Sequence, residues 1–292
     1  MMTKSNLTAS ISIRRKIVNV SMTILVLVAV VLALVPLVLI LGVVFMKGAP
    51  AISLDFLTQA PTAPNFPGGG IAPAIEGSFV MVGLATLISV PIGVGAGIFF
   101  SEWSTSRLST VSGFTNDVLT GFPTMVIGLF VFILIVLTTK TYSAFAGGVA
   151  LSFIMTPIIA RTTSESLKLV PTTLREASMA LGVPRWKTVL RIVLGTGKNG
   201  LLTGILLAIA RASGETAPLL FTAATSTLFI KNLMQPTASM TVLIYYYALS
   251  SVPSWISQAW GAALLLILIM LALNLLVKLT IGRNPTKARM EM

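Results

Sequence analysis

Residues 200–223, GLLTGILLAIARASGETAPLLFTA, form a long apolar segment that one arginine and one glutamate interrupt. A helix of this length is long enough to cross about 30 Å of hydrocarbon. Arg211 and Glu215 are four residues apart, so one helical turn would place them on the same face. If both charges were unpaired and faced lipid, they would cost about 5 to 7 kcal/mol together. We therefore expect both side chains to face a bundle interior or a wet cavity.

The composition of the whole chain indicates an integral membrane protein. Of its 292 residues, 55% are hydrophobic and 10% are charged, whereas soluble domains average about 25% charged residues. The net charge of +12 is spread between apolar runs, so it indicates membrane topology rather than nucleic-acid binding. The chain has no cysteine and no histidine, which excludes disulfides and thiolate metal sites and removes the usual general base. Most enzyme mechanisms are therefore disfavoured.

Six apolar runs are long enough to span a membrane, which predicts an all-α helix bundle. The first span, residues 18–46, is about twice as long as the apolar core of a signal peptide, so we expect an uncleaved anchor. An extracytoplasmic loop of irregular structure is expected at 47–73, followed by a transmembrane domain at 74–281. The other spans are expected near 75–100, 117–138, 143–160, 200–222 and 257–281.

Loop charges predict the orientation of the bundle. With the N-terminus inside, all but four of the 20 lysines and arginines fall in cytoplasmic segments. The exceptions are Lys47, Lys140, Lys231 and the intramembrane Arg211. Because basic residues are enriched on the cytoplasmic side, we expect both terminal tails, 1–17 and 282–292, to be cytoplasmic.

Small residues and prolines indicate how the spans pack. Residues 93–97, GVGAG, and 200–204, GLLTG, have glycines four apart, which lets helix backbones approach closely. Pro91 and Pro218 can kink their helices because proline removes a backbone donor. These features predict ordinary bundle packing and name no function by themselves.

The longest polar segment between spans is residues 161–199. Within it, residues 171–183, PTTLREASMALGV, have apolar side chains at helical spacing, with Thr172 or Thr173 as the expected N-cap and Gly182 as the stop. This predicts an amphipathic helix of about ten residues, near 15 Å long, which is too short to span a bilayer.

Two interpretations of this short helix are open. With Arg175 and Glu176 exposed, it could lie at the lipid interface. It could also be the contact surface through which a soluble partner moves the membrane domain. The second interpretation requires a partner that supplies force from the cytoplasm.

Five residues of this segment have a recognisable spacing: Glu176, Ala177, Gly182, Ile192 and Leu194. The spacing resembles the cytoplasmic EAA loop of bacterial ABC importer permeases. The chain departs from that pattern at Ser178, where a second alanine is usual, and at Gly195, where proline is usual. A small residue at Ser178 should still let a helix dock closely. The resemblance implies that Arg175, Glu176, Ala177, Ser178 and Gly182 couple the chain to an ATPase.

The resemblance covers most of the chain from about residue 66. Five segments are similar to the A-type permease subunits of high-affinity phosphate importers: 68–70, 126–130, 161–163, 168–188 and 204–223. This implies the type I ABC importer permease fold in a bacterial plasma (inner) membrane. It also implies a complex of two homologous permeases, two copies of a cytoplasmic ATPase and an extracytoplasmic phosphate-binding protein. Membrane lipid would be a partner, and nucleic acid would not.

The chain lacks a complete nucleotide-binding loop of its own. Residues 195–199, GTGKN, contain a Gly-Lys pair, but Ile192 replaces the leading glycine and Asn199 replaces the hydroxyl residue that would bind magnesium. We therefore expect a non-catalytic subunit that binds no cofactor or metal. ATP and magnesium would bind to the separate ATPase.

Two interpretations of the intramembrane charges are also open. Arg211 and Glu215 could form an ion pair that only fixes helix packing. Alternatively, the planar guanidinium could meet the translocating anion while Glu215 keeps that binding weak, and the family's matching residues lie in the transport path. Ser213 and Thr216 could offer hydroxyls to an oxyanion, although such side chains more often bond back to the helix.

Three other functions fit less of the sequence. A permease for another oxyanion would share the same architecture. A stand-alone secondary carrier would explain the intramembrane charges, but carriers usually have repeated halves, and the short cytoplasmic helix would then have no purpose. An intramembrane hydrolase would need catalytic residues that the chain lacks, since it has neither histidine nor cysteine.

Overall fold

The computed structural model describes residues 13–64, 66 and 68–282. Helices make up most of this part of the chain, which contains no strand, and the long connections are at 59–71 and 223–239. The predicted all-α class is therefore confirmed. The expected tails fall largely on residues 1–12 and 283–292, which lie outside the described residues.

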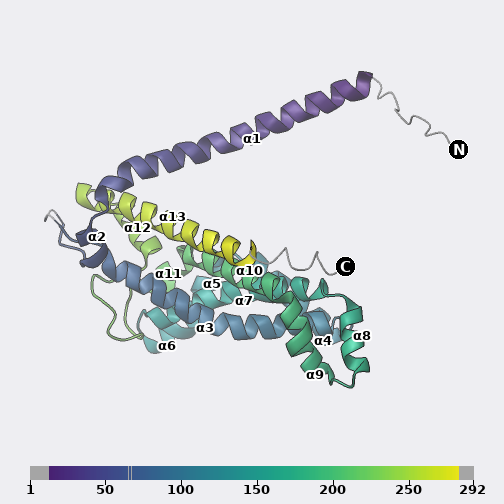
Figure 1. Ribbon diagram of the computed structural model, residues 1–292. Coiled ribbons are helices and arrows are strands. Elements are labelled where there is room, and N and C mark those ends of the chain that lie inside the picture. Colours follow the sequence, from purple (N-terminus) through teal and green to yellow (C-terminus); the bar gives the residue numbers. More distant parts are fainter. Residues whose placement is uncertain (1–12, 65, 67, 283–292) are drawn as a thin grey trace.

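Among the described residues, five helices are long and apolar enough to cross a membrane, and one pair of helices bent against each other meets the same criteria when taken together. Three of these helices lie close to the expected spans: α1 (Ile13–Gly48), α3 (Ala72–Glu102) and α13 (Pro253–Gly282). Figure 1 shows α2 and α12 at one end of the bundle and α4, α8 and α9 at the other. The start of α1 and the end of α13 both point toward the second end, and the assignment of that end to the cytoplasm stays a prediction.

The span expected at 117–138 is bent. It consists of α4 (Arg107–Gly121), α5 (Thr124–Val131), a π-helical segment (Phe132–Val136) and α6 (Leu137–Thr139), and the bend between α4 and the rest is 103°. Pro123 explains the bend, because proline lacks an N–H and disfavours helical geometry at the preceding residue. The apolar run was identified correctly, but α4 was missed because its sequence is only weakly apolar.

The next two spans also differ from their expected bounds. Helix α7 (Ala144–Lys168) continues beyond residue 160. After α8 (Thr172–Ala180), one continuous helix is formed by α9 (Arg185–Lys187), a π-helical segment (Thr188–Val193) and α10 (Leu194–Ser213). Much of the expected polar loop is thus helical, and the fifth span begins at residue 185 rather than 200.

That fifth span also ends early. The chain breaks after Ser213 and continues as α11 (Ala217–Thr222), in which Pro218 occupies the first turn. Gly214 and Pro218 both disfavour an uninterrupted helix here. Pro218 was predicted to kink its helix, but the structure has a complete break at this point.

The remaining described elements are short. The loop expected to be irregular contains a 3₁₀ turn (Ala49–Ala51) and α2 (Leu54–Thr58), whose start is capped by Ser53 accepting a hydrogen bond from the Phe56 amide. A further short helix, α12 (Met240–Ala248), precedes α13. It packs against α3 and α13.

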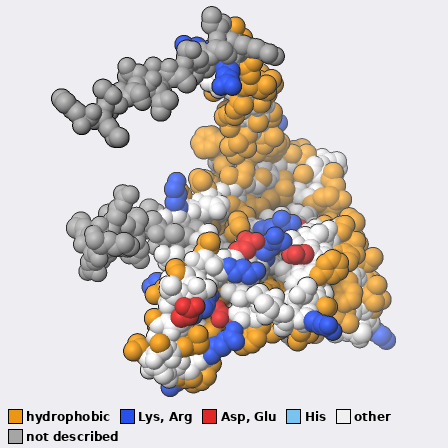
Figure 2. All heavy atoms as spheres, turned by 90° about the vertical axis from the view of Figure 1, so that its right-hand side faces the viewer, with side chains coloured by type: hydrophobic (Ala, Val, Ile, Leu, Met, Phe, Trp, Pro, Cys, Tyr) orange, Lys and Arg blue, Asp and Glu red, His pale blue; other side chains and the backbone are white. Residues whose placement is uncertain are grey.

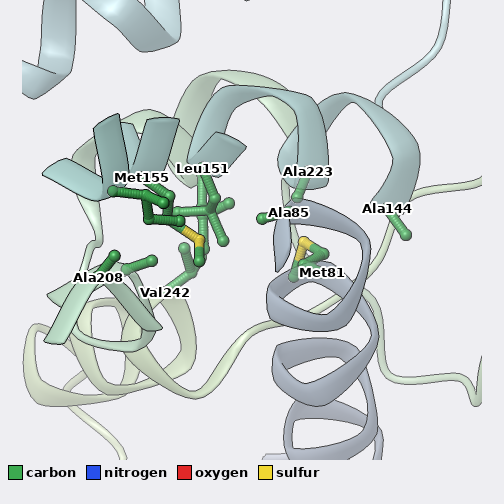
Figure 3. Close-up of a cluster of buried hydrophobic side chains, with 11 residues drawn as sticks. Met81, Ala85, Ala144, Leu151, Met155, Ala208, Ala223 and Val242 are labelled. Atoms are coloured by element: carbon green, nitrogen blue, oxygen red, sulfur yellow. The ribbon is translucent and has the colours of Figure 1, made fainter. Parts of the chain in front are cut away.

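Helix α7 is the centre of the bundle. Some glycines of α3 and α10 face it, since a Cβ added at Gly93 or Gly97 would meet Ile159 or Thr163, and one added at Gly204 would meet Thr162. The predicted close approach of these helices is therefore confirmed. Figure 3 shows the apolar core that surrounds this contact, in which side chains of α3, α7, α10 and α12 meet.

Helix α1 stands apart from this core. Nearly all of its described side chains are exposed, and Figure 1 shows it running away from the other helices. It packs against α13 near its own end, where Val44 is buried and a Cβ at Gly48 would meet Trp260. In a membrane this apolar surface would be covered by lipid.

Candidate functional site

The short helix predicted for residues 171–183 is present as α8. It begins directly after Pro171, and its first turn has no side-chain cap, so the expected role of Thr172 or Thr173 as N-cap is wrong. Gly182 follows the helix with φ of 78°, a left-handed conformation that glycine adopts without steric cost. Gly182 is therefore the stop that the sequence predicted.

Arg175 is not exposed, which corrects the prediction for this residue. Its side chain is 17% exposed, and Arg175 Nη2 lies 3.0 Å from Glu102 Oε1 at the end of α3, where the Glu102 side chain is 5% exposed. The same guanidinium donates to the carbonyl oxygens of Leu167 and Val170 at the end of α7. Glu176 and Ala177 are exposed, as predicted for Glu176.

Ser178 is buried against the helix that follows. Its Oγ lies 2.9 Å from Oγ1 of Thr188, which is also buried and belongs to the π-helical segment. A serine at this position therefore keeps the small size that close packing needs and adds a polar link that alanine could not make. Thr188 was missed because nothing in the sequence signals a partner ten residues away.

Large apolar side chains of α8 and its flanks are exposed. They are Leu169 (84%), Leu174 (41%), Met179 (44%), Leu181 (85%) and Trp186 (61%). A surface helix normally buries its apolar side chains. Helix α8 instead contacts the bundle through Arg175 and Ser178, and its apolar side chains stay exposed beside polar ones such as Glu176. Exposed apolar patches of this kind mark interaction sites.

The end of the molecule that carries α8 is rich in charge. Figure 2 shows lysine, arginine and acidic side chains gathered on this face, whereas the flanks are largely hydrophobic. The contrast is that of a membrane protein whose flanks face lipid and whose end faces water. An apolar patch at such an end is available to a water-soluble partner.

The intramembrane charges lie on either side of a helix end. Arg211 is in the last turn of α10, and Glu215 lies in the break before α11, so they do not share one continuous helix as expected. They are nevertheless close, with Arg211 Nε 3.6 Å from Glu215 Oε1. The arginine side chain is 56% exposed, whereas the glutamate side chain is 15% exposed. The ion pair is thus loose and open on the arginine side.

Arg211 also borders the bend between α4 and α5. A cavity of about 20 Å³ lies between Arg211, Thr120 and Thr124, with α7 on its other side. This volume holds roughly one water molecule. Both the bend and the α10–α11 break therefore lie near the same guanidinium.

Ser213 and Thr216, the two hydroxyl residues near the Arg211–Glu215 ion pair, differ in their hydrogen bonding. Ser213 Oγ donates a 2.8 Å hydrogen bond to the Ile209 carbonyl, which is the back-bonded arrangement that serines in helices usually adopt. Thr216 stands at the start of α11, where its side chain makes no capping bond. The break is held by Thr241, whose hydroxyl donates to the Glu215 carbonyl at 2.9 Å. Thr241 was not predicted from the sequence.

A second charged cluster joins α4 to α7. Arg161 donates to Asp117 at 2.7 Å and to Glu165 at 3.0 Å, and all three side chains are more than half exposed. With Lys168 and Ser164 they border a polar cavity of about 410 Å³. From the sequence, Arg161 marked the cytoplasmic side and belonged to one of the segments that resemble phosphate permeases. Its spacing of four residues from Glu165 was the available signal for this pair.

Residues 195–199, which carry the incomplete nucleotide motif, lie inside α10. A phosphate-cradling loop needs free backbone N–H groups ahead of a helix. Within a helix those groups are already bonded to carbonyls. This stretch is therefore a helical turn rather than a nucleotide-binding loop.

These features define a polytopic helical membrane protein with the short helix α8 at one end. Its fold is similar to a chain of the inward-facing MetNI methionine ABC transporter in its native crystal form. The TM-score is 0.58 with 17% identity, covering 73% of this chain and 93% of that one. A likeness so distant in sequence shows the fold alone, which is that of a type I ABC importer permease.

Sequence comparison identifies the family. Residues 89–283 match the family described as binding-protein-dependent transport system inner membrane component, and the chain belongs to it. The chain is 45% identical to the phosphate transport system permease protein PstA of Haemophilus influenzae, over 80% of this chain and 83% of that one. It is 39% identical to PstA 1 of Mycobacterium tuberculosis strain H37Rv, over 91% of this chain and 88% of that one. The protein is thus a multi-pass component of the inner membrane.

Proposed function

We propose that this chain is a permease subunit of an ATP-driven importer of inorganic phosphate. The observation that carries the proposal is α8, a short helix that is held to the bundle by polar bonds and leaves apolar side chains on and beside it exposed. Such a surface suits a soluble ATPase that docks from the cytoplasm. Phosphate is proposed as the substrate because the relatives described above are named phosphate permeases.

The remaining subunits follow from the same proposal. A second, homologous permease would form the other half of the pathway, and two ATPase copies would bind ATP and magnesium. An extracytoplasmic binding protein would deliver phosphate at the opposite end, where α2 and α12 lie. In this assembly the chain itself performs no ATP chemistry.

Arg211 is the proposed contact for phosphate in the membrane. A guanidinium can form paired hydrogen bonds with a phosphate, and here it is held only loosely by Glu215 at 3.6 Å. A transported anion must bind weakly enough to leave, so a nearby carboxylate that competes for the arginine is useful. Ser213 and Thr216 are weaker candidates, since the Ser213 hydroxyl is already bonded to its own helix.

Reconstitution of the complex in vesicles tests this function. The chain, a second permease, the ATPase and the binding protein should accumulate radiolabelled phosphate when ATP is supplied. Uptake should stop when ATP is depleted and should survive collapse of the ion gradient. Uptake driven by the gradient alone would identify a secondary carrier, and preferential uptake of sulfate would identify another oxyanion as the substrate.

A further inference from the structure

We propose that the buried ion pair between Arg175 of α8 and Glu102 of α3 is the joint through which movement of α8 reaches the membrane helices. The inference rests on the proposed function, because it assumes that an ATPase moves α8. It assigns a role to two residues whose side chains are largely buried inside the chain and paired with each other. They are positioning residues rather than binding residues.

The joint gathers the ends of two spanning helices. Arg175 Nε and Nη2 donate to Glu102 Oε1 at 3.1 and 3.0 Å, which connects α8 to the end of α3. Arg175 Nη1 donates to the Val170 carbonyl at 2.6 Å, and Nη2 donates to the Leu167 carbonyl at 2.9 Å. These carbonyls follow the last turns of α7, where a cation also interacts favourably with the helix dipole. One guanidinium thus fixes α8 to α3 and α7 together.

Polar bonds keep α8 in place because its other side chains make few buried contacts with the bundle. Its large apolar side chains Leu174 and Met179 remain 41% and 44% exposed, and its buried contacts are made by Arg175 and Ser178. Apolar contacts are non-directional and can slide. A planar guanidinium with several fixed donors holds both position and orientation. A displacement of α8 is therefore passed on rather than lost as slippage.

A second set of contacts extends the joint toward the intramembrane arginine. Arg185 Nη2 donates to the Glu102 carbonyl, and the Arg185 guanidinium lies 5.0 Å from the Trp103 ring centroid. Ser178 also contacts Thr188 in the helix that runs from residue 185 to Ser213. The end of α3 is thus linked to both α8 and the helix that carries Arg211.

This geometry separates two functions of α8. Its outward face would bind the ATPase, whereas its inward pair would transmit the motion. A variant of the pair should therefore keep the ATPase bound and lose the coupling between ATP hydrolysis and transport. A purely structural ion pair would instead affect assembly and leave the coupling of assembled complexes unchanged.

The main test is Glu102→Gln in the full complex, a change that keeps the size of the side chain and removes its charge. ATPase association should be unchanged by co-purification. Phosphate accumulated per ATP hydrolysed should fall about fivefold or more, the lower end of typical coupling between distant sites. Glu165→Gln is the matched control, because the Glu165 carboxylate also pairs with an arginine, Arg161, but is 62% exposed, and it should change neither quantity.

A substrate-independent readout separates this inference from the proposed function. The chain has no cysteine, so spin labels can be attached to cysteines introduced at the exposed positions Thr105 and Met179. The distance distribution between α8 and the end of α3 should be narrow in the otherwise unmodified chain and broad in Glu102→Gln. This result would hold even if the complex carried another solute.

Arg175→Lys gives a second variant in case Glu102→Gln does not assemble. Lysine retains the charge but cannot reach the carboxylate and both carbonyls with one planar group, so coupling should again fall. Normal phosphate per ATP and a narrow distance distribution in either assembled variant would overturn the joint. Failure of both variants to insert would make the pair a folding element and would also overturn it. Absence of phosphate uptake by the unmodified complex would instead overturn the proposed function, and the spin-label distances would still decide the joint.

Discussion

Replacing Gly97 by alanine should disrupt the contact between α3 and α7. The added Cβ would lie 2.5 Å from Thr163 Cβ and 2.6 Å from the Ala160 carbonyl oxygen. Favourable contacts between carbon atoms are roughly 3.5 to 4.0 Å, so the two helices would have to separate locally by about 1 Å. The carbonyl belongs to the backbone of α7 and cannot rotate away. The strain is therefore taken up by the helix pair itself.

The magnitude follows from two opposing effects. Inserting a methyl group into a close-packed contact costs about 1–3 kcal/mol, whereas replacing glycine by alanine within a helix gains about 0.5–1 kcal/mol. Gly95 provides the matched control, because it lies two residues away on α3 and has nothing within 4 Å of its added Cβ. Gly95→Ala should show only the gain. The two variants should differ in unfolding free energy by about 1–3 kcal/mol, which is the overpacking cost alone.

Unfolding of the purified chain in detergent micelles measures this difference. Loss of helical circular dichroism with increasing denaturant should occur earlier for Gly97→Ala than for the unmodified chain. Gly95→Ala should unfold at the same concentration as the unmodified chain or later. Equal stability of the two alanine variants would refute the close approach of α3 and α7 at Gly97.

Four other variants address α8 and the intramembrane charges. The Gly182→Leu variant should insert normally but show reduced ATPase association and reduced ATP hydrolysis in the presence of the binding protein. The reason is that a residue with a side chain costs about 1–2 kcal/mol in the left-handed conformation. If ATPase association and ATP hydrolysis were both unchanged, Gly182 would have no coupling role. Arg211→Gln with Glu215→Gln should assemble and still fail to take up phosphate, since neutral amides cannot offset phosphate desolvation, and Arg211→Lys should retain reduced uptake. Robust uptake by the double variant would leave the pair as a packing device. Ser178→Ala should lose one hydrogen bond to Thr188, worth about 1 kcal/mol, and keep near-normal uptake; loss of uptake with normal assembly would contradict this.

The sequence by itself determined the features that depend on short stretches. The number of apolar runs long enough to cross a membrane follows from local composition, and the structure contains five such helices and one bent pair. The close-packing glycines of α3 and the stop at Gly182 were also visible, because glycine has particular steric properties wherever it occurs. Local chemistry was enough for these predictions.

Tertiary structure decided which faces of those helices meet. Arg175 was expected to be exposed because its neighbours in sequence form a short polar segment, yet its partner Glu102 lies 73 residues earlier. The contact of Arg161 with Asp117 spans 44 residues. Whether a charge is solvated or paired depends on the helix that packs over it, which the local pattern does not contain. Arg211 and Glu215 illustrate the same limit. Their spacing predicted that they would be close together. The end of α10 between them and the exposure of Arg211 instead depend on how α10 and α11 pack in the bundle.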